Sequence, residues 1–407
     1  MTAGDRAPDL DLAELLLAGP MAPISDPYRL YARLRRELPI AEIGPRPHPG
    51  VFITRFDDVH RVLKDHETFS SRSNAERGIG LVMGRTLIGM DGHEHLKHRA
   101  LITPSLAPRA LRGEFPGIVD RIAHGIIDGF ASRGRADLVS EFTFVYPLRV
   151  FTEILGLPPE DVPQFHHWAI DLSHVAKDPA RGLAAAQKTK EYLAPMVEQK
   201  RARPDNDLIS ELARARVDGE SLTDEEIISF LRLLVIAGAE TTYHLLGSAL
   251  FALLGDPSLL ASIRANRDRI GALLDETLRW ESPVQMITRE AAEDTVLGGV
   301  EIAKGKEVVV SIGSANRDER RFPDPDHFDI GRFDLGRHGE PHIAFGFGRH
   351  YCAGSRLALL EATVGLNALL DRLPELRFDA RSEPARVIGV AFRSPDHLRV
   401  EFQATRR

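Results

Sequence analysis

The single cysteine of this chain, Cys352, is the residue with the clearest capacity for chemistry. It lies in the string Phe345-Gly346-Phe347-Gly348-Arg349-His350-Tyr351-Cys352-Ala353-Gly354. The glycines permit tight turns and let the backbone approach a flat ligand closely. We expect a helix to start just after Cys352, so that its free N–H groups and positive dipole end favour a thiolate, the form that binds iron.

Cys352 taken alone has two other interpretations. A lone cysteine is most often a buried structural residue. It can also be a nucleophile, for which His350 would be the base, although residues two apart rarely reach the required geometry. A chain with one cysteine has no intrachain disulfide.

A second candidate motif, Ala237-Gly238-Ala239-Glu240-Thr241-Thr242, falls in the middle of a predicted helix over 223–254. Thr223 and Glu226 form a capping box at its start, and Gly255-Asp256-Pro257 is a stop signal. Residues 230–254 are apolar enough to span a membrane, but they include Arg232, Glu240 and His244, which would be costly there. We therefore expect a core helix.

The chemistry of this motif depends on small and polar residues side by side. A small residue lets a planar group approach the helix backbone. The Thr241 hydroxyl can bond back to a carbonyl and open the helix locally, and Glu240 can supply protons through water. A helix with a tolerated glycine and a solvent-facing glutamate explains the motif alone equally well.

The whole ten-residue string resembles a known signature. Its Phe-x-x-Gly-x-x-x-Cys-x-Gly spacing matches the haem-binding motif of the cytochrome P450 family at Phe345, Gly348, Cys352 and Gly354. The resemblance extends from about residue 25 to the C-terminus. It implies a mostly α fold with a smaller β part (α+β), haem b as the cofactor, and Cys352 as the axial ligand of its iron.

The resemblance also implies roles for other residues. Glu240 and Thr241 would deliver protons during oxygen activation, and Gly238 would leave room for oxygen. The haem propionates would bind cationic or polar side chains, namely His95, Arg99, Arg289 and His350. A direct zinc site at His93, His95 and His98 is disfavoured, because the three do not share a helix face. The Glu276-Thr277-Leu278-Arg279 pair would bind Arg332 and support the cysteine loop.

The substrate pocket implied by the resemblance is apolar. Its expected lining residues are Leu233, Ala237, Val284, Met286, Ile287 and Phe392. The late turn 390–393 and the stretch 72–88 would complete it. Arg72, Arg77 and Arg85 would meet a carboxylate at the entrance if they face inward.

The elements that must position these residues follow from hydrophobic periodicity. We expect one catalytic domain over 1–407, with helices mainly in 57–280 and 352–375 and strands in 40–56 and 295–312. A helix over 27–38, a hairpin over 40–56 and strands over 295–302 and 308–312 are predicted. The first twenty residues are expected to be flexible.

The composition restricts the partners. The formal net charge is −7 and no basic arm is present, so no nucleic-acid partner is expected. The acidic N-terminus does not resemble a secretion signal or a membrane anchor, which favours a cytoplasmic protein, and a monomer is expected.

The family resemblance also implies partners. We find no nucleotide-binding fingerprint, so NAD(P)H would act only through a ferredoxin or flavodoxin and its reductase. They would dock on basic residues near the cysteine, namely Lys97, Arg109, Arg112, Arg349 and Arg356. O2 and a small organic molecule would be the substrates. The alternatives are a peroxide-driven peroxygenase, a haem-binding sensor without turnover and, more remotely, a cysteine hydrolase.

Overall fold

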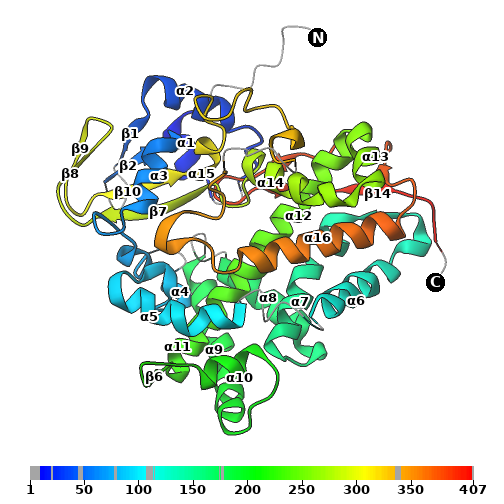
Figure 1. Ribbon diagram of the computed structural model, residues 1–407, viewed down its shortest axis with the longest axis horizontal. Coiled ribbons are helices and arrows are strands. Elements are labelled where there is room, and N and C mark those ends of the chain that lie inside the picture. The colour runs from blue at the N-terminus through cyan, green and yellow to red at the C-terminus, as the bar shows by residue number, and fades with distance from the viewer. Residues whose placement is uncertain are drawn as a thin grey trace.

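The computed structural model describes residues 10–19, 22–44, 49–77, 80–106, 113, 115–173, 175, 178–334 and 341–405. Most of the described chain is helical, with a five-stranded sheet at one side (Figure 1). The α-helices are α1 (Leu12–Leu17), α2 (Tyr28–Glu37), α3 (Phe56–Lys64), α4 (Gly80–Met83), α5 (Gly92–Ile102), α6 (Phe115–Asp128), α7 (Val145–Leu155), α8 (Val162–Ser173), α9 (Pro179–Ala202), α10 (Leu208–Arg214), α11 (Asp224–Leu234), α12 (Thr241–Gly255), α13 (Pro257–Ala265), α14 (Ile270–Trp280), α15 (Ile312–Ala315) and α16 (Ser355–Arg372).

The strands are short, and most of them lie in the first 70 residues or after residue 285. They are β1 (Ile40–Ile43), β2 (Gly50–Ile53), β3 (Phe69–Ser70), β4 (Arg135–Asp137), β5 (Arg216–Val217), β6 (Glu220–Ser221), β7 (Met286–Ala291), β8 (Thr295–Leu297), β9 (Val300–Ile302), β10 (Glu307–Ser311), β11 (Arg377–Phe378), β12 (Val387–Ile388), β13 (Ser394–Pro395) and β14 (Arg399–Glu401). The predicted mostly α fold with a smaller β part is therefore confirmed.

The main sheet joins two distant segments of the chain in the order β1-β2-β10-β7-β3. β1 and β2 form the predicted antiparallel hairpin, with Ile40 opposite Ile53. β10 runs parallel to β2 and antiparallel to β7, so that Val310 lies opposite Ile287. The sheet thereby fixes the strand that carries Arg289.

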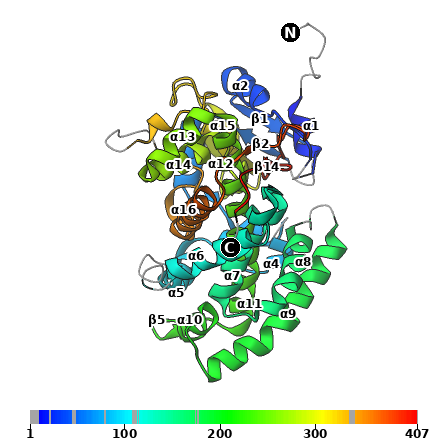
Figure 2. The same cartoon turned by 90° about the vertical axis from the view of Figure 1, so that its right-hand side faces the viewer.

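The helical core forms around α12 and α16, which lie next to each other in both views (Figures 1 and 2). Buried leucines of both helices, such as Leu246, Leu253, Leu366 and Leu369, pack together with α6 and α14. Burying such side chains contributes roughly 1.5–3 kcal/mol each. The two helices that carry the candidate motifs are thus held against each other.

The predicted long helix is confirmed, with one internal irregularity. Thr223 and Glu226 form the expected capping box, and Asp224–Gly255 is helical throughout but changes to a π-helix over Val235–Glu240. This is the one helix within the described ranges that is long and apolar enough to cross a membrane. Because 67% of its apolar window is buried inside the protein, it has the character of a core helix.

Three details of the sequence prediction are wrong. The first twenty residues are not uniformly flexible, because Asp11 and Glu14 cap α1 and Leu15 is fully buried; residues 1–9, 20 and 21 lie outside the described part. Residues 295–302 form a hairpin, β8–β9, with Gly298 and Gly299 at positive φ in its turn. The predicted β regions also omit the strands β3 to β7 and β11 to β14.

Candidate functional site

The loop before α16 is shaped around Cys352. The backbone N–H of Cys352 donates a hydrogen bond to the carbonyl of Phe345 at 2.9 Å. Gly348 has φ +70°, and a Cβ added there would lie 2.8 Å from the carbonyl oxygen of Leu63 at the end of α3. Only glycine fits this close approach, so the glycine of the motif holds the loop against α3.

The start of α16 lies directly behind the sulfur, and Gly354 is its N-cap residue. Burial raises the pKa of the Cys352 thiol, although the backbone N–H groups of Gly354 and Ser355 and the charge of Arg99 lower it. For the free thiol, the expectation that the helix start alone favours a thiolate is therefore wrong, because desolvation outweighs those contributions. A metal cation bound to the sulfur would supply the positive charge that stabilises the thiolate.

Two candidate cofactor ligands near this loop, His95 and Arg289, make no ion pair with a carboxylate among the described residues, although Asp91 acts on both electrostatically. His95 is buried, and neither ring nitrogen has a hydrogen-bond partner in the described structure. Burial lowers the pKa of Arg289 to about 10, and its one recorded hydrogen bond, at 2.8 Å, is to the carbonyl of Thr288. A buried cation is stable only beside an anion.

His350 joins these residues into a cluster. Its ring lies 4.1 Å from that of His95, and its Nε2 is 3.2 Å from Asp91 Oδ1. Burial alone would raise the pKa of Asp91, but hydrogen bonds from His350, Ser70 and the Ser71 backbone lower it to about 2. Asp91, which sequence reasoning missed, orients His350 and leaves His95 unpaired.

These residues fit haem. A sulfur donor, an imidazole without a hydrogen-bond partner and a buried guanidinium without an ion pair would match an iron and two propionates. Arg99 is partly exposed and interacts electrostatically with Cys352, His95 and His350. The described residues contain no group of three or more side chains suited to bind a bare metal ion, zinc included.

On the long helix, the motif residues divide between two faces. The hydroxyl of Thr241 donates to the carbonyl of Ala237 at 2.7 Å, and Ala237 is exposed although its neighbours Ile236 and Ala239 are buried. A Cβ on Gly238 would instead meet the ring of Phe151 at 3.6 Å, which is ordinary contact. The prediction that Gly238 leaves room for oxygen is therefore corrected, because Ala237 is the small residue that borders open space.

This difference predicts the effect of two substitutions. Ala237→Leu should slow carbon monoxide binding to the reduced haem protein by at least about tenfold, because the larger side chain fills the open space. Gly238→Ala, the matched control, should stay within about twofold, since its methyl group only contacts Phe151. Flash-photolysis rebinding measures both. Equal rates for the two variants would contradict the assignment.

The scaffold residues lie as the family resemblance implied. Arg279 makes two 2.7 Å hydrogen bonds to Glu276, and neither side chain is exposed. Arg279 also donates to the carbonyls of Asn316, Pro325 and His327. Arg332 Nε lies 3.5 Å from Glu276 Oε1. These contacts tie α14 to the irregular segment that leads to Cys352.

The predicted pocket residues are only partly brought together. Val284 pairs with Phe392 in an isolated β-bridge, while Leu233 lies on α11 beside Ala237. Met286 packs towards the core that contains Val309, and Ile287 towards the one that contains Val308. Adjacent strand residues point to opposite faces, so both cannot line one pocket. Ile287 shares the face of Arg289.

Two of the predicted entrance arginines are already neutralised. Arg77 forms an ion pair with Glu290 at 2.9 Å, and Arg85 binds both carboxylate oxygens of Glu94. Arg72 is exposed. The pairs leave two fewer free charges to attract an acidic substrate.

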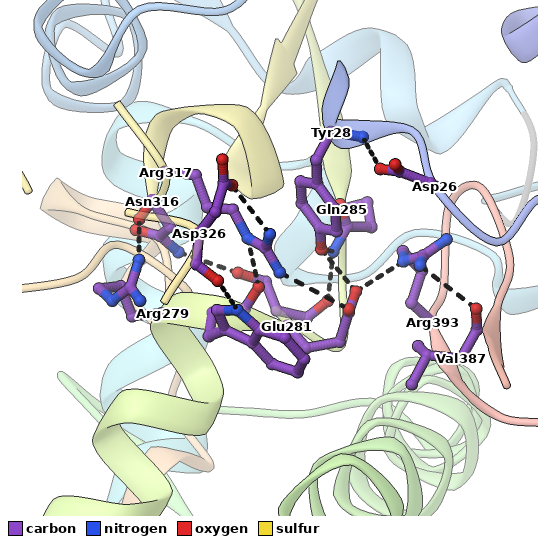
Figure 3. Close-up of polar contacts among 12 residues, drawn as sticks. Asp26, Tyr28, Arg279, Glu281, Gln285, Asn316, Arg317, Asp326, Val387 and Arg393 are labelled. Atoms are coloured by element: carbon purple, nitrogen blue, oxygen red, sulfur yellow. Dashed lines mark hydrogen bonds and ion pairs between the residues drawn. The ribbon is translucent and has the colours of Figure 1, made fainter. Parts of the chain in front are cut away.

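Sequence reasoning missed a buried polar cluster behind the turn 390–393 (Figure 3). Arg393 donates to Glu281 at 2.6 Å and to the carbonyl of Gly389 at 2.7 Å, and Tyr28 also donates to Glu281. Arg393 therefore points away from Phe392 and anchors the turn to α14 and α2. Glu281 directly follows α14, but no local pattern connects it to Arg393 or Tyr28.

Comparison with known proteins matches the amino-acid sequence of this chain to one family. The sequence model described as Cytochrome P450 matches residues 161–384. Cytochrome P450 107B1 of Saccharopolyspora erythraea is 35% identical over 100% of this chain and 97% of its own length. The biotin biosynthesis cytochrome P450 of Bacillus subtilis is 32% identical over 93% of this chain and 97% of its own.

Solved structures agree with this match. CYP109E1 from Bacillus megaterium, in complex with testosterone, has a TM-score of 0.83 and 30% identity, covering 93% of this chain and 99% of that one. P450BioI, in complex with an acyl carrier protein that carries hexadec-9Z-enoic acid, has a TM-score of 0.82 and 33% identity, covering 93% and 98%.

Proposed function

Because this chain belongs to the cytochrome P450 family, we propose that it is a haem-thiolate monooxygenase that inserts one atom of O2 into a small, largely apolar organic molecule. The observation that carries this proposal is the cluster at the start of α16. There Cys352 lies within electrostatic reach of Arg99, His95 has no hydrogen-bond partner among the described residues, and the buried Arg289 feels the charge of Asp91 but donates only to the carbonyl of Thr288. A cysteine hydrolase has no use for polar side chains left without partners in this way.

Haem b, when bound, supplies the binding and reductive activation of O2. Cys352 would bind its iron through the sulfur, which accepts hydrogen bonds from the N–H groups of Gly354 and Ser355. The remaining cofactor contacts would come from the cysteine loop and the residues around His95, namely Phe345, Gly348, Gly354, His95, Arg99, Arg289 and His350.

Protons reach the site from Glu240 and Thr241. Burial raises the pKa of Glu240 to about 7, so that both protonation states are populated near neutral pH, as suits a proton donor. The π-helical turn that ends at Glu240 frees the adjacent backbone, and Thr241 bonds back to Ala237. The hydroxyl can therefore pass a proton on without leaving the helix.

Loss of the Thr241 hydroxyl should uncouple electron use from product formation. We expect Thr241→Val to lower the amount of product formed per NADPH by about 10²-fold, the lower range for a lost acid–base group. The electrons that no longer lead to product should appear as hydrogen peroxide. Thr242→Val is the matched control, because its hydroxyl bonds to Gly238 in the same way at 2.8 Å but is buried. Equal coupling in the two variants would contradict the role of Thr241.

In the proposed reaction a separate ferredoxin or flavodoxin, with its NAD(P)H-dependent reductase, delivers the electrons. The enzyme acts as a monomer in the cytoplasm. Arg349 and Arg356 are exposed on either side of Cys352 in the sequence and form the proposed docking charge. Lys97 is already paired with Glu220. Arg109 and Arg112, also expected there, lie outside the described residues.

Isotope labelling tests the reaction. With a surrogate ferredoxin system and testosterone and corticosterone as first probes, we expect a product with one ¹⁸O atom from ¹⁸O₂. Label from H₂¹⁸O₂ alone would indicate a peroxygenase, and label from H₂¹⁸O a hydrolase. Absence of turnover across a wider panel of compounds that shift the haem spin state would favour a sensor.

A further inference from the structure

His244 lies one helical turn after Glu240 on α12 and has no assigned role. It is fully buried, and neither of its ring nitrogens has a partner among the described residues. Its Nε2 is 4.0 Å from Glu240 Oε1, and Glu240 Oε2 is also unpaired. Two unsatisfied polar side chains therefore face each other in the interior of the protein.

Such an arrangement is costly. An unpaired buried polar group destabilises a protein by about 1–3 kcal/mol, and native structures retain few of them. A small rotation of the Glu240 side chain, or one bridging water, would satisfy both residues. Because both side chains destabilise the protein while they lack partners, we expect a hydrogen bond between His244 and Glu240 to form during function.

Aromatic packing fixes the His244 ring. It stacks on Phe392 with centroids 5.8 Å apart and 11° between planes, and it also contacts Tyr243. Phe144 holds Tyr243 edge-on from the other side. The ring has little freedom, so the movement needed to close the 4.0 Å gap falls to Glu240.

The surroundings keep His244 neutral. Burial lowers its pKa to about 3, and a neutral imidazole can donate one N–H without adding charge. Tyr243, whose pKa burial raises to about 12, also feels the negative charge of Glu240, which raises its pKa further. The helices packed against Val235–Glu240 carry further charged or titratable side chains, and none of the contacts given for these side chains is with Glu240. They are Tyr146, Arg149 and Glu153 on α7, His167 and Asp171 on α8, and Asp224, Glu225, Glu226 and Arg232 on α11.

We propose that His244 is a positioning residue for Glu240. Its Nε2–H donates a hydrogen bond to the Glu240 carboxylate and thereby keeps the acid beside Thr241. This inference rests on the proposed function, because it concerns how the proton donor of that reaction is held. His244 itself gains and loses no proton. Its N–H stabilises the ionised carboxylate and thereby makes Glu240 a stronger acid than burial alone would allow.

The test is an infrared titration of the carboxyl group in the ferric haem-loaded protein. The protonated Glu240 band is identified by its loss in Glu240→Gln. His244→Phe keeps the ring stack on Phe392 but has no N–H, and should raise the titration midpoint of Glu240 by about one unit, a tenfold weaker acid. His244→Gln, which restores an N–H donor, should return the midpoint towards that of the native protein.

Controls make the result decisive. Ser248→Ala removes another unpaired buried polar group one turn further along α12 and should leave the midpoint unchanged. His244→Leu, measured in parallel, also lacks the N–H donor and should raise the titration midpoint of Glu240 in the same way, even if the phenylalanine of His244→Phe does not fit the buried site. A native midpoint in either donor-free variant that keeps its haem spectrum would overturn the proposal.

The reduced carbon monoxide spectrum separates this inference from the proposed function. If the native protein lacks the strongly red-shifted Soret band of a haem thiolate, the proposed function fails. If that band is present in every variant and only the Glu240 midpoint does not respond, the function stands and His244 has no positioning role.

Discussion

Replacing Cys352 by alanine should abolish turnover while leaving the chain folded. The variant removes the sulfur ligand that the proposed reaction requires. Its cost to stability should be below about 1 kcal/mol, because the substitution removes only the sulfur of a side chain that belongs to none of the hydrophobic core clusters. Activity measurements and urea unfolding, on the same preparation, give the two quantities.

Tyr351→Phe is the control for this substitution. Tyr351 is the exposed neighbour of Cys352, and loss of its hydroxyl should change neither turnover nor stability appreciably. Measurable oxygen insertion by Cys352→Ala, at a rate near that of the native enzyme, would contradict the role of the sulfur.

Arg279→Ala should destabilise the protein by about 3–5 kcal/mol, the usual result of breaking a buried ion pair. Glu276 would remain fully buried with its two 2.7 Å hydrogen bonds from Arg279 lost. The carbonyls of Asn316, Pro325 and His327 would also lose their donor. Denaturant unfolding monitored by circular dichroism measures the free energy.

Arg29 offers a matched comparison for Arg279. It pairs with Asp26 at the same three-residue spacing, but its side chain is 85% exposed. Arg29→Ala should cost less than about 0.5 kcal/mol, because an exposed pair gains little. Similar losses for the two arginine variants would show that the buried pair is not the support of the cysteine loop.

The parts of the fold that sequence predicted best have local causes. The capping box at Thr223 and the stop after Gly255 define the long helix within a residue. The π-helical turn inside it has no such signal. The hairpin β8–β9 was missed although Gly298 and Gly299, both at positive φ, mark its turn.

The candidate site divides in the same way. Cys352 could be identified because its neighbours have fixed spacing in the sequence. Whether Ala237 or Gly238 borders open space depends on Phe151, which lies on another helix. The pairing of Arg77 with Glu290 joins residues 213 positions apart, which no local pattern reveals.

The spectrum of the reduced, carbon monoxide-bound protein tests the central claim most directly, because it reports the ligand of the haem iron. The native chain should show the strongly red-shifted Soret band of a thiolate-ligated haem, and Cys352→His should bind haem but lose that shift. An unshifted band in the native protein, or a shifted band that survives the histidine substitution, would contradict the assignment of Cys352 as the iron ligand.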